Sequence, residues 1–182
     1  IWVGDHANYA EAHGTTACRA CHGADSRGTV LAASQRAWIA TTDWGARSFF
    51  RGAKIGCYEC HNGPDSEAAT TDRAPVATSR TATASAAIPL RIALTVTDAD
   101  GDPLELRIVD QPAHGTVAIR GTLALLYPDA GFAGGDSFTF AAWDGKRESN
   151  LATVALTIHD AGGLFADGLE CASAARWTSA YP

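Results

Sequence analysis

Methionine is absent from this chain of 182 residues, and hydrophobic runs are short. No apolar run approaches the ~20 residues that a helix needs to span a bilayer. Because translation starts at methionine, we expect that an N-terminal segment has been removed, most simply a secretory signal peptide. Basic residues are also scarce, and the net charge of −6 argues against nucleic acid as a partner, since phosphate contacts need a basic face. These absences predict an exported protein without a membrane span.

Cysteine is missing from the long stretch between residues 61 and 170, although the chain has five cysteines. Four of them lie in two segments of identical spacing, Cys18-Arg19-Ala20-Cys21-His22 and Cys57-Tyr58-Glu59-Cys60-His61. This spacing is the attachment pattern of c-type haem. Two thiols three positions apart can each bond a vinyl group of one porphyrin, and the adjacent histidine then lies under the iron. The sequence therefore predicts two haem c groups, with His22 and His61 as proximal iron ligands.

Three other interpretations of the paired cysteines compete with haem attachment. Four thiols in two pairs could hold a structural zinc ion, but zinc does not explain a histidine directly after each pair. A thioredoxin-like redox pair belongs near a βαβ pattern, and none is visible. Two disulfides would make both histidines coincidental. The haem interpretation is favoured because it accounts for both cysteines and the histidine of each segment.

Histidine is favoured as the other axial ligand of each iron, because a chain without methionine excludes a Met/His iron within one chain. His6 and His13 lie seven residues apart in a segment of good helix formers, so they share one face of a predicted helix. This spacing suits one distal histidine for each iron. His13 is only five residues before Cys18, so we expect it to serve the haem at Cys57 and Cys60, although a ligand from a neighbouring subunit is an alternative.

Most of residues 1–67 resembles a family of bacterial multihaem cytochromes. The matching elements are His6-x-x-Tyr9, His13-Gly14, Cys18-x-x-Cys21-His22-Gly23, Arg27-Gly28-Thr29 and the run Gly56–Pro64. The resemblance implies haems with histidine on both faces, in an electron-transfer chain. It also implies His6 and His13 as distal ligands, without settling which iron each one binds.

Beyond about Ala74 the chain alternates apolar and polar residues with a period of two, which is typical of strands. Examples are Phe138 with Phe140, and Val154 with Leu156 and Ile158. Turn-forming clusters separate these runs, which predicts an antiparallel β-sandwich. Residues 74–158 resemble the immunoglobulin-like or cadherin-like repeats of secreted bacterial proteins, on matches that include Asp98–Leu104, Gln111–Val117, Gly135–Phe138 and Asp144-Gly145. This resemblance implies a spacer or an interaction surface, and it makes His114 a structural residue.

We therefore expect a small, mostly helical or irregular dihaem cytochrome domain (1–73), an all-β immunoglobulin-like sandwich (74–159) and a C-terminal tail (160–182). Asp98, Asp100 and Asp102 are a candidate calcium site because their hard oxygens cluster, but an aspartate-capped turn is favoured. His159 is a reserve ligand candidate. Cys171 in the tail is left without an internal partner and is a candidate for an intermolecular contact.

The expected function is electron transfer with no bond chemistry, between redox proteins or extracellular acceptors, outside the cell rather than in the periplasm. A sharper hypothesis makes the chain the repeating subunit of a cytochrome filament, since two haems span a short distance unless copies stack. The alternatives are a monomeric periplasmic carrier and a dihaem peroxidase or oxidoreductase. An enzyme is disfavoured because His6 and His13 would occupy the open iron positions that catalysis needs.

Overall fold

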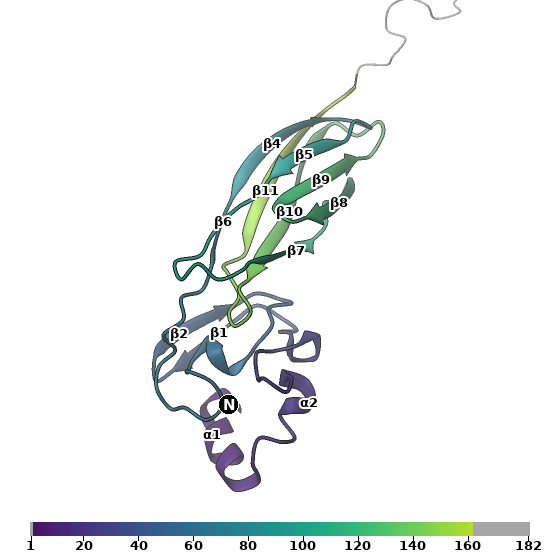
Figure 1. Cartoon of the computed structure of the whole chain (residues 1–182). Coiled ribbons are helices and arrows are strands. Elements are labelled where there is room, and N and C mark those ends of the chain that lie inside the picture. Colours follow the sequence, from purple (N-terminus) through teal and green to yellow (C-terminus); the bar gives the residue numbers. More distant parts are fainter. Residues whose placement is uncertain (1, 162–182) are drawn as a thin grey trace, which may run out of the picture.

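The computed structural model describes residues 2–161, with side chains placed from His6 onward. Figure 1 shows two modules stacked end to end, which we call the N-terminal module (residues 2–71) and the sandwich (residues 72–161). In order, the N-terminal module contains α1 (Trp2–His13), α2 (Arg19–His22), the 3₁₀ turn η1 (Val30–Ala32), β1 (Trp38–Thr42), β2 (Gly45–Phe49) and the 3₁₀ turn η2 (Cys57–Glu59).

The prediction of a small, mostly helical or irregular dihaem cytochrome domain is wrong for the N-terminal module. Its helices are α1, with 12 residues, and the single turn α2. The longest element between α2 and η2 is the antiparallel hairpin β1–β2, in which Trp38 pairs with Phe49. Isoleucine, threonine and aromatic residues favour a strand here, and Gly45 adopts the positive φ of 99° that the turn requires.

A small apolar cluster lies beneath the hairpin. Ala40, Phe49 and Ala53 are buried in it, and Trp38 and Phe50 pack against them. Few large side chains are fully buried in this module, so contacts with the sandwich contribute to its stability.

The sandwich is built as the alternating pattern predicts. Its strands are β3 (Val76–Thr78), β4 (Arg80–Ser85), β5 (Leu90–Ala93), β6 (Thr95–Thr97), β7 (Glu105–Asp110), β8 (Gly115–Arg120), β9 (Leu123–Pro128), β10 (Gly134–Trp143) and β11 (Ala152–His159). One sheet has the order β4-β11-β10-β7 and the other β5-β9-β8, with β3 and β6 paired beside them. Every pairing is antiparallel except that of β4 with β11.

The core of the sandwich lies between the two sheets. Phe138 and Phe140 of β10 are fully buried, as is Leu126 of β9. Along β11, buried and exposed residues alternate strictly, so Val154, Leu156 and Ile158 share the inner face as expected. The turn between β10 and β11 lies at the end of the sandwich that meets the N-terminal module (Figure 1).

Candidate functional site

The first Cys-X-X-Cys-His segment forms the short helix α2 and the residue before it. Cys18 is half-buried, Cys21 is exposed, and His22 is half-buried. The Nδ1 of His22 lies 2.8 Å from the carbonyl oxygen of Ile55. Because a carbonyl only accepts, Nδ1 carries the proton, and Nε2 of the neutral ring keeps a lone pair. The imidazole is therefore fixed in orientation, with Nε2 as its acceptor atom.

The second segment forms the 3₁₀ turn η2 and the two residues after it. His61 donates from Nδ1 to the carbonyl oxygen of Gly63 at 2.6 Å, so its ring has the same proton arrangement as His22. Burial raises the pKa of the Cys57 thiol, and burial likewise raises the pKa of Cys60. Both thiols therefore stay protonated at neutral pH, which makes them poor nucleophiles for thiol–disulfide exchange. The four cysteines of the two segments are free.

A close crossing of two backbones brings the segments together. The amide of Cys57 donates to the carbonyl oxygen of Ser26 at 2.9 Å. Gly56 lies so near Arg27 that a Cβ on it would meet the Arg27 carbonyl carbon and oxygen at 2.5 Å. The Gly28 amide also bonds to the His22 carbonyl oxygen at 2.9 Å. Only glycine allows this approach, so Gly56 sets how the two segments lie against each other.

The candidate distal histidines both lie on α1, and the structure places them differently from our expectation. The rings of His6 and His61 are 6.2 Å apart and nearly parallel, at 18°. His13 instead stacks on Tyr9, and its Nδ1 lies 3.0 Å from the Tyr9 carbonyl oxygen. His6 is thus the α1 histidine whose ring faces His61, whereas the assignment of His13 to the second segment stays a prediction. Whether any of the four histidines binds iron stays a prediction.

A group of buried charges at the module boundary escaped the sequence analysis. Glu59, between the two cysteines of the second segment, is only 4% exposed, and Glu148 of the β10–β11 turn is 7% exposed. The Glu148 amide donates to Glu59 Oε1 at 2.8 Å, and Arg147 lies 3.6 Å from Glu59 Oε2. Burial raises the pKa of Glu59 to about 7, although Arg147 and the Glu148 amide act in the opposite direction.

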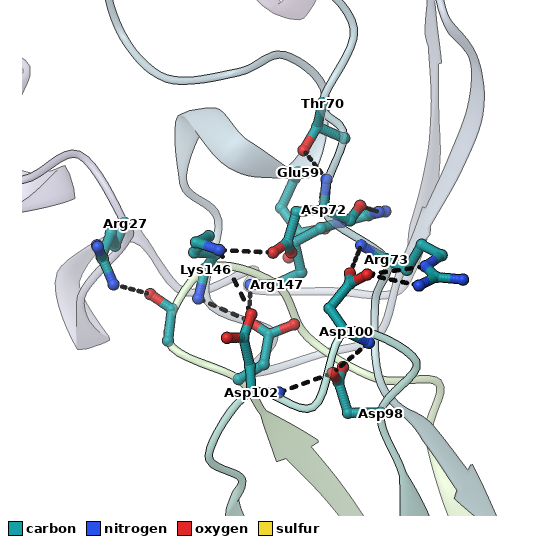
Figure 2. A network of polar contacts seen from close by, with 12 residues as sticks. Arg27, Glu59, Thr70, Asp72, Arg73, Asp98, Asp100, Asp102, Lys146 and Arg147 are labelled. Carbon is teal, nitrogen blue, oxygen red and sulfur yellow. Dashed lines mark hydrogen bonds and ion pairs between the residues drawn. The ribbon is translucent and has the colours of Figure 1, made fainter.

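The aspartates of the 98–102 loop do not form the candidate calcium site. Figure 2 shows them in a network of polar contacts with neighbouring cations. Asp100 binds Arg73 at 2.7 Å, and Asp102 lies 3.4 Å from Lys146, which also binds Asp72. Asp98 accepts the amides of Asp100 and Asp102 at 2.9 and 3.0 Å. The loop is thus the aspartate-capped turn that the sequence analysis favoured.

The expected cofactors are corrected by the structure. Within residues 2–161, no group of three or more His, Cys, Asp or Glu side chains lies close enough to hold a metal ion. Arg73 and Lys146 already pair with two of the three candidate calcium ligands, Asp100 and Asp102. Neither calcium nor the two haem c groups is therefore assigned to the protein.

The remaining candidates lie away from both segments. His114 stacks on Phe132 at a ring distance of 3.8 Å, and its amide donates to Asp136 at 2.7 Å, which fits a structural role. His159 is exposed at the end of β11. Cys171 lies outside the described residues. No helix in the described part of the chain is long and apolar enough to cross a membrane.

The two facing sheets, ordered β4-β11-β10-β7 and β5-β9-β8, define a β-sandwich of the immunoglobulin class. Residues 72–157 match the family described as "Bacterial Ig domain", which confirms the immunoglobulin-like prediction for this half of the chain. Domains of that family are commonly extracellular or surface-exposed. None of the comparisons supports the resemblance of residues 1–67 to multihaem cytochromes, and no curated protein matches the chain.

Several solved structures are similar to part of the chain at low identity. An endo-fucoidan hydrolase of glycoside hydrolase family 107, MfFcnA4, is 19% identical with a TM-score of 0.42, over 70% of this chain and 19% of that one. The fibronectin(III)-like modules of Clostridium thermocellum CbhA are 13% identical with a TM-score of 0.35, over 68% and 60%. Titin M4 is 15% identical with a TM-score of 0.30, over 50% and 99%. This chain thus spans about a fifth of the hydrolase length.

Proposed function

We propose that this chain is an exported electron-transfer protein in which each of the two Cys-X-X-Cys-His segments of the N-terminal module holds one redox group. One observation carries the proposal. Two thiol–imidazole segments of identical spacing lie in one small module, where the chain after the first segment crosses the chain before the second at Gly56, and both histidines have Nδ1 bonded to a carbonyl oxygen. Orienting bonds of this kind fix a functional imidazole and leave Nε2 available.

The surroundings of the second segment favour electron transfer over thiol chemistry. The raised pKa of Cys57 and Cys60 disfavours the thiolate that attacks disulfides. The imidazoles of His6 and His61 face each other, and Trp44 lies 5.8 Å from His61. Partly enclosed, oriented side chains need little rearrangement when an electron arrives, and that property suits a carrier rather than a catalyst with an open site.

The test is a spectroelectrochemical titration of the native protein together with its intact mass. We expect reversible electron uptake in two components. The paired substitutions Cys57→Ala and Cys60→Ala remove one component, and Cys18→Ala with Cys21→Ala remove the other. The difference between the measured mass and the polypeptide mass identifies the redox group. A protein with no reversible electron uptake would show that the proposal is wrong.

Assembly into a filament is part of the same proposal. Among the described strands, β7 and β8 are each hydrogen-bonded along one side only, and sheet edges of this kind can pair with another chain. Negative-stain imaging and mass photometry of native material test this. Filaments are expected, whereas a uniform monomer at high concentration excludes them.

A further inference from the structure

The turn between β10 and β11 inserts charged residues of the sandwich into the N-terminal module. Glu148 is the centre of this contact, and its side chain is 3% exposed. Its Oε1 accepts the Lys54 amide at 3.1 Å, while its own amide donates to Glu59 Oε1 at 2.8 Å. Lys54 precedes Cys57 by three residues, and Glu59 lies between Cys57 and Cys60. Glu148 therefore binds the chain on both sides of the first cysteine of the second segment.

The Glu148 carboxylate is itself held in place from the sandwich. Arg107 of β7 donates to Glu148 Oε1 at 2.8 Å and to the Gly52 carbonyl oxygen at 2.9 Å. The same guanidinium lies 5.4 Å from the centre of the Phe50 ring. A buried carboxylate with a charged, hydrogen-bonded partner on a strand is a rigid anchor, because removing either group leaves the other as an unpaired buried charge.

Among the described residues, the first segment makes no equivalent buried-charge contact with the sandwich. The turn instead contacts the chain just after this segment, where Arg27 Nη1 donates to the Gly145 carbonyl oxygen at 3.2 Å, five residues beyond His22. The sandwich thus contacts the two Cys-X-X-Cys-His segments unequally, and it holds the second one through a buried charge.

We infer that Glu148 is a positioning residue for the Cys57–His61 segment. Through it, the sandwich sets the reduction equilibrium of the redox group held by that segment and not that of the redox group held by the first segment. This inference rests on the proposed electron transfer. A buried negative charge beside a redox group opposes the arrival of an electron, because low-dielectric surroundings screen the repulsion weakly. Neutralising Glu148 also leaves Arg107 uncompensated, which favours the reduced form further.

The test compares Glu148→Gln with Asp136→Asn in the full chain. Asp136 is a matched control, because it is also a carboxylate that accepts backbone amides but lies at the opposite end of β10. Glu148→Gln is expected to raise the equilibrium constant for reduction of the second-segment component by about three- to tenfold, with the first-segment component unchanged. Asp136→Asn is expected to change neither. Glu148→Asp keeps the charge and is expected to shift the component less than Glu148→Gln does.

Histidine side-chain NMR provides a second readout that needs no redox activity. The His61 imidazole signals are expected to move in Glu148→Gln, while those of His114 stay in place. Equal shifts of both redox components, or no shift of either in a folded variant, would overturn the inference. If the unmodified protein takes up no electrons, the proposed function fails, and the His61 signals alone then decide whether Glu148 positions the segment. If Glu148→Gln does not fold, Glu148→Asp is measured in its place: its shorter side chain is expected to move the His61 signals and not those of His114, and unmoved His61 signals overturn the inference.

Discussion

Replacing Gly56 with alanine is expected to destabilise the protein by about 3 kcal/mol or more. The added Cβ would lie 2.5 Å from the carbonyl carbon and oxygen of Arg27 and 2.8 Å from the Ser26 carbonyl oxygen. These are backbone atoms, so no side-chain rotation relieves the overlap, and the two crossing chains must separate. Separation breaks the bond from the Cys57 amide to Ser26. Urea unfolding followed by circular dichroism measures the change.

The effect of Gly56→Ala should also reach the imidazole of the first segment. His22 is oriented by the carbonyl oxygen of Ile55, the residue just before Gly56. Displacing the backbone at Gly56 therefore weakens the hydrogen bond that fixes the His22 ring. Gly135 is the matched control because its φ is not in the left-handed region and a Cβ there meets only the Leu156 carbonyl oxygen at 4.0 Å. Gly135→Ala is expected to change stability by less than about 1 kcal/mol. Equal losses in the two variants would contradict the role given to the crossing.

The sandwich could be predicted from the sequence because its strands carry their burial pattern locally. Phe138 and Phe140, and the alternating residues of β11, lie on the inner face as expected. Strand β4 gave no such signal, since the buried side of Arg80–Ser85 carries only alanine. Its parallel pairing with β11 joins residues such as Ala82 and Leu156. These residues are far apart in the sequence, so a local pattern does not predict that they pair.

The candidate site was predictable in its parts but not in its assembly. The spacing of cysteine and histidine identified the two segments, and the helix carrying His6 and His13 was found. The facing of His6 and His61 depends on where α1 lies relative to η2, which is a tertiary property. The buried pair Glu59 and Glu148 lies 89 positions apart in the chain. A charged residue between two cysteines looks exposed in a sequence, because charged groups are rarely buried unless paired.

The stability of the protein should fall as the pH rises from 5 to 8.5, and Glu59 is the reason. Burial raises its pKa from 4.5 to about 7, so the folded state holds its proton more tightly than the unfolded state. The resulting stabilisation is complete below the unfolded pKa and is lost as the pH passes through the folded one. This difference between the folded and unfolded pKa of Glu59 corresponds to about 3 kcal/mol in the free energy of unfolding. Burial raises the pKa of Asp144 as well, so its contribution has the same sign and begins at its own, lower unfolded pKa.

Urea unfolding at closely spaced pH values measures this dependence, and two variants assign it. Glu59→Gln mimics the protonated carboxyl, and its oxygen can still accept the Glu148 amide, so its stability should be nearly flat between pH 5 and 8.5. Glu105→Gln removes an exposed carboxylate at the start of β7 and should keep the full slope. A flat curve in the unmodified protein, or an unchanged slope in Glu59→Gln, would contradict the prediction. Because Glu59 lies between Cys57 and Cys60, the same proton equilibrium makes the second segment sensitive to pH near neutrality.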